Sequence, residues 1–543
     1  MGAIMRPGHL LSLTALTGLI ACGGDDAEPK GDSGSPQIGD SAQETGDTAP
    51  SEALLSQQLV DAIAIDGLLA HLDAFQVIAD ENGGNRNAGD PGFEASLDYA
   101  TAQFESYGYT VERDEFTFST VEELSDPALE QTAPNTETYA SDQFATFAYS
   151  GSGDATANVQ SVDLMLPPGS ESNSSTSGCE SDDFADFTSG SIALIQRGSC
   201  TFQTKVDNAV TAGAVGVLIF NEGQNGRTEV VQGQLDAEVS NTVPVLGLGF
   251  DLGETLAELV EASDLEMRVK VDLERVDTPA ANLFVRTSTG KTDRQVVVGA
   301  HLDSVAAGAG INDNGTGSAL ILELARAFAE GNLAPDNQVV FALWGAEEWG
   351  LLGSIDWVFT LESDELANVF ANLNFDMIGS PNAGRFVYDG DGSSGGGAGP
   401  TGSGEIESIF NDWFDAQGVE YEATPFNGRS DYGAFIYMGI PAGGLFTGAE
   451  GVKSSSQADK FGGESGQAFD PCYHQACDDI ENLDNTMFLE MARAAAYATG
   501  EVAMKEETWG RSEALSSLLA RKDEIRAEVH KLGQCGHGGL PVE

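Results

Sequence analysis

The strongest constraint on the fold is a regular alternation of apolar strand and helix patterns that begins near Thr278. Strand patterns at 296–301, 338–345 and 369–379 are separated by helical patterns at 317–331 and 347–361. Strands and helices that alternate in this order form a mostly parallel sheet flanked by helices. We therefore predict an α/β fold, in which ligands bind at the carboxyl ends of the strands.

Side chains that bind metals stand where these strand patterns end. His301 closes the first strand, Glu347 and Glu348 follow the second, and Asp376 lies near the end of the third. An isolated histidine or aspartate in a loop is more often structural than functional. A set of such residues on successive strand ends favours a metal site, because these ends meet at one edge of the sheet.

The residues available suit a pair of zinc ions. Zinc binds nitrogen and oxygen ligands from His, Asp and Glu, and two ions about 3.5 to 4 Å apart need a bridging carboxylate and an open position for water. We expect His301 and Asp376 to hold one ion and Glu348 and His474 to hold the other, with Asp313 as the bridge.

Two further carboxylates are expected to support this chemistry. Glu347 would take a proton from the attacking water and pass it to the leaving amine, as a general base. Asp303 lies two residues after His301. It would accept the other ring proton of that histidine or order the loop, although an ordinary turn aspartate is the alternative.

Several segments resemble the signature blocks of the secreted di-zinc aminopeptidases of metallopeptidase family twenty-eight. They are GAHLDS, GAGINDNGTGS, FALWGAEEWGLLGS, NFDMIGSPN, GRSDYGAF, IPAGGLFTGAE and AFDPCYHQACDD. The resemblance covers nearly all of 59–500 and implies the same zinc ligands and the same general base. It also implies that Tyr473 stabilises the tetrahedral intermediate and that Arg429 contacts the substrate. The alternatives are packing beside the loop for Tyr473 and a salt bridge to Asp431 for Arg429.

A separate unit precedes the metal-binding part. Its strand–helix–strand pattern contains the run from Arg197 to Phe202, followed by Lys205 and the small residues 212–214. These residues resemble the protease-associated domain, a β-rich module whose implied role is to shape substrate access or mediate contacts. The predicted division is a signal peptide at 1–22, an acidic linker at 23–58, the N-terminal part of the peptidase at 59–140, the inserted domain at 141–277, the catalytic domain at 278–502 and a helical tail at 503–543.

The first residues predict export. Arg6 precedes an apolar run from Leu10 to Ile20, which is too short to span a bilayer but suits a signal peptide. The segment Leu19–Cys22 resembles the lipobox of bacterial lipoproteins, which implies lipidation at Cys22; an ordinary signal peptide with an incidental cysteine is the alternative. Because Gly23 is not an aspartate, which would resemble an inner-membrane retention signal, we expect an outer-membrane or cell-surface lipoprotein, or a secreted protein.

The cysteines are consistent with an oxidising compartment. Besides Cys22, the chain contains five cysteines. We expect disulfides between Cys472 and Cys477 and between Cys179 and Cys200, with Cys535 left over. Sequence alone does not fix this connectivity.

The charge balance argues against anionic partners. The chain has 86 acidic and 25 basic residues and a formal charge of −61, which repels nucleic acids and anionic membrane surfaces. We expect membrane contact only through the lipid anchor, and no pattern indicates an oligomeric state. The acidic residues are spread along the chain, which is typical of a hydrated surface.

The predicted function is a zinc-dependent aminopeptidase that removes N-terminal residues, apolar ones such as leucine, from peptides and proteins. Phe426 and Phe446 are candidates for lining its side-chain pocket. A carboxypeptidase of the same fold is the alternative within the class. Two alternatives lie outside this class of enzyme. A cyclase-like relative with one zinc would lose part of the ligand set of the second ion. A non-catalytic cell-surface peptide-binding protein would lose Glu347 or a ligand.

Overall fold

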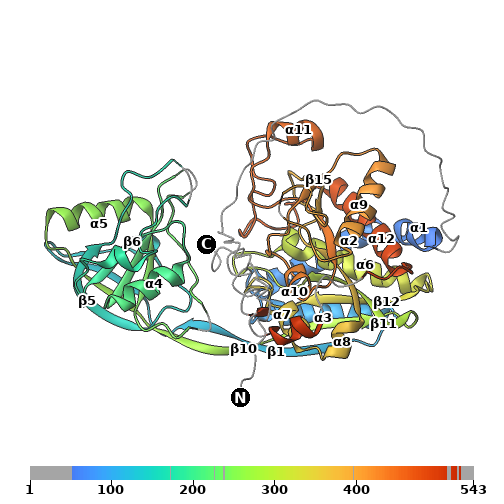
Figure 1. Cartoon of the computed structure of the whole chain (residues 1–543), viewed down its shortest axis with the longest axis horizontal. Coiled ribbons are helices and arrows are strands. Elements are labelled where there is room, and N and C mark those ends of the chain that lie inside the picture. The colour runs from blue at the N-terminus through green and yellow to red at the C-terminus, as the bar shows by residue number, and fades with distance from the viewer. Residues whose placement is uncertain are drawn as a thin grey trace, which may run out of the picture.

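The computed structural model describes residues 52–509, with gaps at 171–172, 225–226, 237–238 and 396, together with 515–522 and 525–526. The chain forms two lobes that are joined by a long ribbon (Figure 1). In this ribbon β1 (Glu112–Glu123) pairs antiparallel with β10 (Leu273–Arg286) along its full length. The predicted signal peptide, Cys22 and Cys535 lie outside the described residues.

The larger lobe is built on an eight-stranded sheet in the order β1-β10-β12-β11-β13-β16-β14-β15. Its central strands run parallel, which confirms the predicted α/β fold with a mostly parallel sheet; they are β12 (Asn337–Trp344), β11 (Lys291–His301), β13 (Val369–Phe375) and β16 (Ala442–Phe446). Antiparallel pairs attach β10 on one side and β14 (Phe386–Tyr388) on the other, and β14 runs parallel to β15 (Glu422–Thr424).

Alternate residues of the central strands face two separate cores. In β11, Val296 and Val298 pack in the core on one face of the sheet, whereas Val297 packs in the core on the other. In β12, Phe341 packs in the first of these cores and Trp344 packs in the second. Because successive side chains of a strand point to opposite faces, a continuous apolar run requires cover on both sides.

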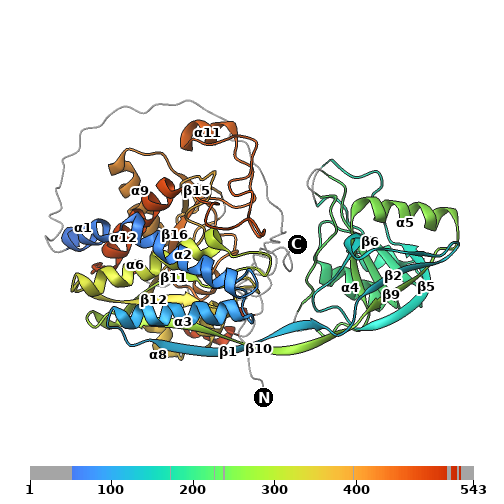
Figure 2. The same ribbon diagram turned by 180° about the vertical axis from the view of Figure 1, so that it is seen from behind.

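Helices supply that cover (Figures 1 and 2). The first face is packed by α1 (Glu52–Ala62), α2 (Ile65–Glu81), α3 (Pro91–Ser106), α6 (Thr316–Glu330), α9 (Ser403–Gln417) and α12 (Asn485–Ala503). The second is packed by α7 (Leu352–Thr360), α8 (Ser363–Asn368), α10 (Tyr432–Tyr437) and α13 (Leu515–Ala520). The helix α11 (Ser455–Phe461) has no buried residues. The folded part begins within the predicted linker 23–58, because α1 starts at Glu52 and packs against α12.

The smaller lobe contains a second eight-stranded sheet, in the order β3-β2-β9-β5-β6-β7-β8-β4. Its strands are β2 (Ala128–Ala133), β3 (Glu137–Thr138), β4 (Phe144–Thr146), β5 (Gly153–Ser161), β6 (Ile192–Gln196), β7 (Gly216–Phe220), β8 (Val245–Leu248) and β9 (Glu266–Val271). Its helices are α4 (Phe202–Thr211), α5 (Phe250–Ala262) and the short 3₁₀ turns η1 (Ser141–Gln143) and η2 (Ser181–Phe184).

The β6–α4–β7 unit has the predicted strand–helix–strand arrangement, with β6 and β7 parallel. The lobe begins earlier than the predicted domain start at 141, because β2 and β3 belong to its sheet through their pairing with β9 and with each other. The predicted end at 277 falls inside β10, which continues from this lobe into the larger one.

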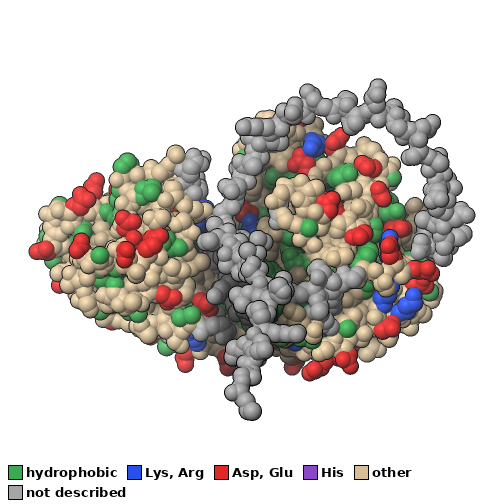
Figure 3. Space-filling model, in the orientation of Figure 1, with side chains coloured by type: hydrophobic (Ala, Val, Ile, Leu, Met, Phe, Trp, Pro, Cys, Tyr) green, Lys and Arg blue, Asp and Glu red, His purple; other side chains and the backbone are tan. Residues whose placement is uncertain are grey.

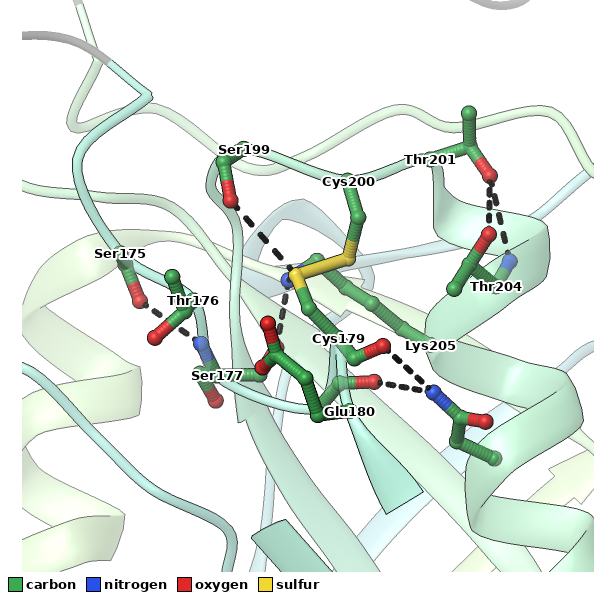
Figure 4. The surroundings of a disulfide bond; sticks show 12 residues. Ser175, Thr176, Ser177, Cys179, Glu180, Ser199, Cys200, Thr201, Thr204 and Lys205 are labelled. Carbon is green, nitrogen blue, oxygen red and sulfur yellow. Dashed lines mark hydrogen bonds between the residues drawn. A yellow bond between two sulfur atoms is a disulfide. The ribbon is translucent and has the colours of Figure 1, made fainter. Parts of the chain in front are cut away.

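Both expected disulfides are present. Cys179 is bonded to Cys200 beside α4, and Cys472 is bonded to Cys477 in the larger lobe. Figure 4 shows the first of these, with the buried Lys205 reaching from α4 toward it. The Nζ atom of Lys205 lies 3.6 Å from Cys179 Sγ and donates to the backbone oxygen of Ser177 at 2.5 Å.

The surface is acidic on both lobes. Figure 3 shows Asp and Glu side chains scattered over the visible face, with few Lys and Arg side chains among them. Among the described residues, no single helix is long and apolar enough to cross a membrane. The consecutive segments Leu55–Ala62 and Ile65–Glu81 are long and apolar enough for a membrane span only when taken together, and a bend of 58° separates them. Their buried leucines pack in the core of the larger lobe.

Candidate metal centre

The ends of three parallel strands bring the predicted ligands together. His301 is the last residue of β11, Asp376 follows directly after β13, and Glu347 and Glu348 lie in the turn after β12. The backbone φ angles of Ala346 and Met377, beside these acidic residues, are 55° and 52°. Such left-handed conformations cost about 1 to 3 kcal/mol each for residues other than glycine, and they are concentrated at functional sites.

Asp313 stands between the two predicted histidines. Its Oδ1 lies 3.3 Å from Nε2 of His301, and its Oδ2 lies 3.3 Å from Nε2 of His474. On the first side, Nε2 of His301 is also 3.3 Å from Oδ1 of Asp376; on the second, Nε2 of His474 is 3.1 Å from Oε2 of Glu348. The structure therefore groups these five residues as the sequence predicts, with one carboxylate shared by both halves.

Glu347 lies beside the predicted ligands. Its Oε2 is 3.7 Å from Nε2 of His301, and the two residues and Asp376 form one group that could hold an ion. Asp313, Glu348 and His474 form a second group of this kind. In each group the possible ligand atoms all lie within 4.8 Å of one another.

The donor atoms fit zinc. Nε2 of His301 and Oδ1 of Asp376 are buried and make no hydrogen bond, although burying such groups without partners is unfavourable. Nδ1 of His301 lies 3.1 Å from the backbone oxygen of Asp303. A hydrogen on Nδ1 leaves the lone pair of Nε2 facing the carboxylates, which is the arrangement that a metal-binding histidine needs.

Asp303 joins two loops. Its carboxylate accepts hydrogen bonds from the backbone nitrogens of Glu347 and Glu348, at 3.1 and 3.3 Å. Asp303 is predicted from the sequence to accept the second ring hydrogen of His301. The backbone oxygen of Asp303 is placed to do so, whereas its carboxylate oxygen Oδ1 lies 3.6 Å from Nδ1 of His301. The carboxylate instead orients the turn that carries both glutamates.

The electrostatic field of the site favours positive charge. Burial by itself lowers the pKa of His301, but Glu347 and Asp376 raise it well above its usual value. Burial also lowers the pKa of His474, but nearby carboxylates, Glu348 foremost, raise this pKa to about 10. Burial raises the pKa of Asp313, but its contacts with both histidines hold that pKa below the usual range.

Tyr473 and Arg429 lie together beside this centre. Tyr473 stacks on the neighbouring His474, with ring centroids 3.8 Å apart, and its hydroxyl accepts a hydrogen bond from Nη2 of Arg429 at 3.1 Å. Burial raises the pKa of Tyr473 well above its usual value, so the phenol keeps its hydrogen near neutral pH. Arg429 pairs with Glu450 at 2.7 Å, which corrects the alternative of a salt bridge to Asp431.

A cavity of about 260 Å³ opens onto the same residues. Asp313, Glu347 and Asp376 line one part of it, and aromatic and apolar side chains line another, namely Met377, Phe386, Tyr388, Phe446 and Phe469. Phe446, a predicted pocket residue, is thus part of this lining. Phe426 does not line the cavity, but it stacks on Tyr388 with centroids 5.3 Å apart.

The sequence has close relatives among known proteins. The profile of Peptidase family M28 matches residues 282–499, and that of the PA domain matches 161–256. An "Aminopeptidase" of Pseudomonas aeruginosa is 44% identical over 437 residues, which are 80% of each chain. The chain belongs to peptidase family M28.

Two other proteins are similar to this M28 peptidase. "Leucine aminopeptidase 2" of Trichophyton equinum is 43% identical over 326 residues, or 60% of this chain and 65% of the relative. BSAP, described as a zinc aminopeptidase from Bacillus subtilis, has a solved structure that superposes with a TM-score of 0.60 over 83% of this chain and 96% of its own. Its sequence identity of 22% supports likeness of fold alone.

Sequence reasoning missed the residues that orient the predicted ligands. The hydroxyl of Ser430 donates to Oδ2 of Asp376 at 2.6 Å. The carboxylate of Asp478 accepts the backbone hydrogens of Asn312 and Asp313, at 2.8 and 3.0 Å. Asp478 follows the predicted disulfide in the motif CYHQACDD, and this proximity to His474 was the only signal that could have indicated it.

Proposed function

We propose that this chain is a zinc-dependent aminopeptidase that removes apolar residues from the N-terminus of peptides and proteins. The observation that carries the proposal is Asp313, whose two oxygens face two histidines and which lines a partly apolar cavity. Membership of family M28 and the printed names of the aminopeptidase relatives support it.

The proposed zinc ligands are those grouped around Asp313, namely His301 and Asp376 for one ion and Glu348 and His474 for a second. When bound, zinc supplies Lewis acidity that polarises the scissile carbonyl and acidifies water. Glu347 accepts a proton from the attacking water at its carboxylate and delivers it to the leaving nitrogen. The Tyr473 hydroxyl donates a hydrogen bond to the carbonyl oxygen as negative charge develops there.

The charges around the cavity favour a substrate with a free amine over one with a free carboxylate. Asp313, Glu347, Asp376 and Glu450 line it, and the one basic residue among its lining is Arg429. Arg429 is already paired with Glu450. The lining of the cavity therefore offers the C-terminal carboxylate of a carboxypeptidase substrate no basic side chain that is not already paired, whereas a substrate ammonium group meets carboxylate oxygens.

The apolar wall of the cavity supports a preference for apolar first residues. Met377, Phe386 and Phe446 would remove an aliphatic or aromatic side chain from water, at about 25 cal/mol per Å² of buried apolar area. The name of the Trichophyton relative supports leucine as a substrate residue. We expect leucine-p-nitroanilide to be cleaved with a higher kcat/KM than the glutamate or lysine compounds.

The decisive experiment compares leucine-p-nitroanilide with its N-acetylated form, using the purified chain with and without a chelator. A Glu347→Gln variant is assayed in parallel, because it keeps the size of the side chain and removes its basicity. We expect cleavage of the free-amine substrate alone, with loss of turnover on chelation and a fall of about 10² to 10⁴ in kcat for the variant.

Two results would overturn the proposal. Equal cleavage of the acetylated compound would show that no free amine is recognised. Absence of cleavage by a protein that retains zinc, together with release of C-terminal residues from a peptide, would favour the carboxypeptidase of the same fold.

We also propose that the protein is exported and anchored by lipid at Cys22, with the site outside the inner membrane. The support is the signal-like pattern of 1–22, which lies outside the described residues. Incorporation of labelled palmitate in an expressing bacterium tests this. The label should be lost in a Cys22→Ala variant, and its absence from the unmodified protein would contradict lipidation.

A further inference from the structure

The loop between α2 and α3 contains a fully buried arginine. Arg86 is 0% exposed, and it precedes the region that matches the M28 profile. Its guanidinium donates through Nε to the backbone oxygen of Ala309 at 2.8 Å, through Nη2 to that of Gly310 at 2.6 Å, and through Nη1 to that of Leu302. One rigid side chain thus satisfies three main-chain carbonyls.

These carbonyls belong to the loop that connects two proposed ligands. Leu302 follows His301 directly, and Gly310 lies three residues before Asp313. The backbone of Arg86 is attached to the same loop, because its nitrogen donates to the Ser304 hydroxyl at 2.9 Å and its oxygen accepts from the Ser304 nitrogen at 3.3 Å. Arg86 therefore holds both ends of the loop and its middle.

The adjacent residue contacts a second ligand-bearing turn. Oδ1 of Asn87 accepts a hydrogen bond from the indole nitrogen of Trp349 at 3.0 Å. Trp349 immediately follows Glu348. Two consecutive residues outside the metal site are therefore attached to the loops that supply His301, Asp313, Glu347 and Glu348.

The charge of Arg86 is directed toward an acidic region. Burial lowers its pKa to about 10, and Asp303, Asp478, Asp313 and Glu348 oppose that effect, so the guanidinium is protonated near neutral pH. The ring of Phe75 lies 4.9 Å below it. The side chain is thus fixed by carbonyls on one side and an aromatic ring on another.

We propose that Arg86 is a positioning residue of the metal centre, which holds the 302–310 loop so that His301 and Asp313 face the same ions. Asn87 serves the same purpose for the turn that bears Glu347 and Glu348. The inference rests on the proposed zinc-dependent function. Lysine cannot replace Arg86 fully, because a single ammonium group lacks the planar set of donors that reaches carbonyls at several fixed positions.

The test measures zinc affinity of the full chain by competition with a chromophoric chelator. Arg86→Met and Arg86→Lys are compared with Arg326→Met. Arg326 is a suitable control because it is a partly buried arginine of α6 that contacts Glu323 and the backbone of Ala62, and it is in the same lobe. Unfolding of each protein is recorded in excess chelator, so that loss of fold stability is separated from loss of zinc binding.

We expect Arg86→Met to raise the zinc dissociation constant by about 10- to 100-fold, the usual effect of removing a group that orients ligands. Arg86→Lys should be intermediate, and Asn87→Ala should weaken zinc binding to a smaller extent. Arg326→Met should lower the stability of the metal-free protein without changing zinc affinity. The absorption spectrum of the cobalt-substituted protein should change in the Arg86 and Asn87 variants and stay unchanged in Arg326→Met, because it reports ligand geometry.

Unchanged zinc affinity and an unchanged cobalt spectrum in Arg86→Met would overturn the inference. If Arg86→Met does not fold, the same two measurements are made on Arg86→Lys, and unchanged values there would overturn the inference. These results differ from a failure of the proposed function, in which the unmodified chain itself would neither bind zinc nor cleave leucine-p-nitroanilide.

Discussion

Arg429 donates from Nη1 to Oε1 of Glu450 at 2.7 Å, and the same guanidinium reaches the hydroxyl of Tyr473 through Nη2. Its carbon Cζ also lies 5.8 Å from the centre of the Tyr473 ring. Arg429 thus connects a carboxylate at the rim of the cavity to the phenol beside the metal centre. The direction of the Tyr473 hydroxyl depends on this contact.

Replacement of Arg429 should lower kcat more than replacement of its partner does. Arg429→Met removes the donor that orients Tyr473, and a displaced group near the reacting atoms can cost about 10²-fold in rate. Glu450→Gln should change kcat by less than about fivefold, because the Glu450 side chain is 55% exposed and exposed ion pairs contribute about 0 to 1 kcal/mol. Steady-state kinetics with leucine-p-nitroanilide measure both, and equal losses would contradict this order.

Removal of metal should lower the midpoint of thermal unfolding. The carboxylates of Asp313, Glu347 and Asp376 converge at buried positions, and they repel one another when no cation is bound. Zinc at 100 times its dissociation constant would add about 2.7 kcal/mol to the free energy of unfolding. Calorimetry with chelator and with added zinc measures the shift. A His301→Ala/His474→Ala variant, which lacks one proposed ligand of each ion, should show a much smaller difference, and an equal shift there would place the zinc elsewhere.

The disulfide of the larger lobe should matter for catalysis, and that of the smaller lobe should not. Cys472 and Cys477 enclose Tyr473 and His474, and His474 has a φ angle of 56°. Loss of this bond in Cys472→Ala/Cys477→Ala frees the loop, so kcat and zinc affinity should fall by about tenfold or more.

The matched control is Cys179→Ala/Cys200→Ala, which removes the disulfide beside α4. It should destabilise the smaller lobe by about 3 kcal/mol and leave kcat at its original value. Equal kinetic effects of the two double variants would show that the 472–477 bond has no special role at the site.

Lys205 should make the stability of the smaller lobe depend on pH. Burial lowers the pKa of Lys205 to about 8 from a usual 10.5, so between these values the unfolded chain binds more protons than the folded one. Stability then rises with pH in this window, and the cost of the buried charge is fully present below pH 8.

The measurement compares Lys205→Met with the unmodified chain by calorimetry at pH 7.5 and 9.5. The free-energy difference between the two proteins should change by about 2 kcal/mol across this range, with the variant gaining its larger advantage at the lower pH. A constant difference would mean that Lys205 is not held at a lowered pKa.

Much of the larger lobe follows from local sequence patterns. The run Val296–Val298 predicted a strand covered on both faces, and its residues do divide between two cores. The residue types at the strand ends predicted a metal site because histidine and carboxylate side chains are rarely gathered at one sheet edge without a use. Disulfides at 179–200 and 472–477 were also predicted, since the paired cysteines are near one another in the chain.

Sequence by itself determined the secondary structure around the site and which histidine and carboxylate side chains gather there. Only the tertiary structure decided that Glu450 rather than Asp431 pairs with Arg429, that β2 and β3 belong to the smaller lobe, and that Arg86 reaches the loop after His301. The physical reason is the range of the interactions. Apolar periodicity reflects burial within a few residues, whereas the partner of a charged group is set by where the folded backbone carries residues that are distant in sequence.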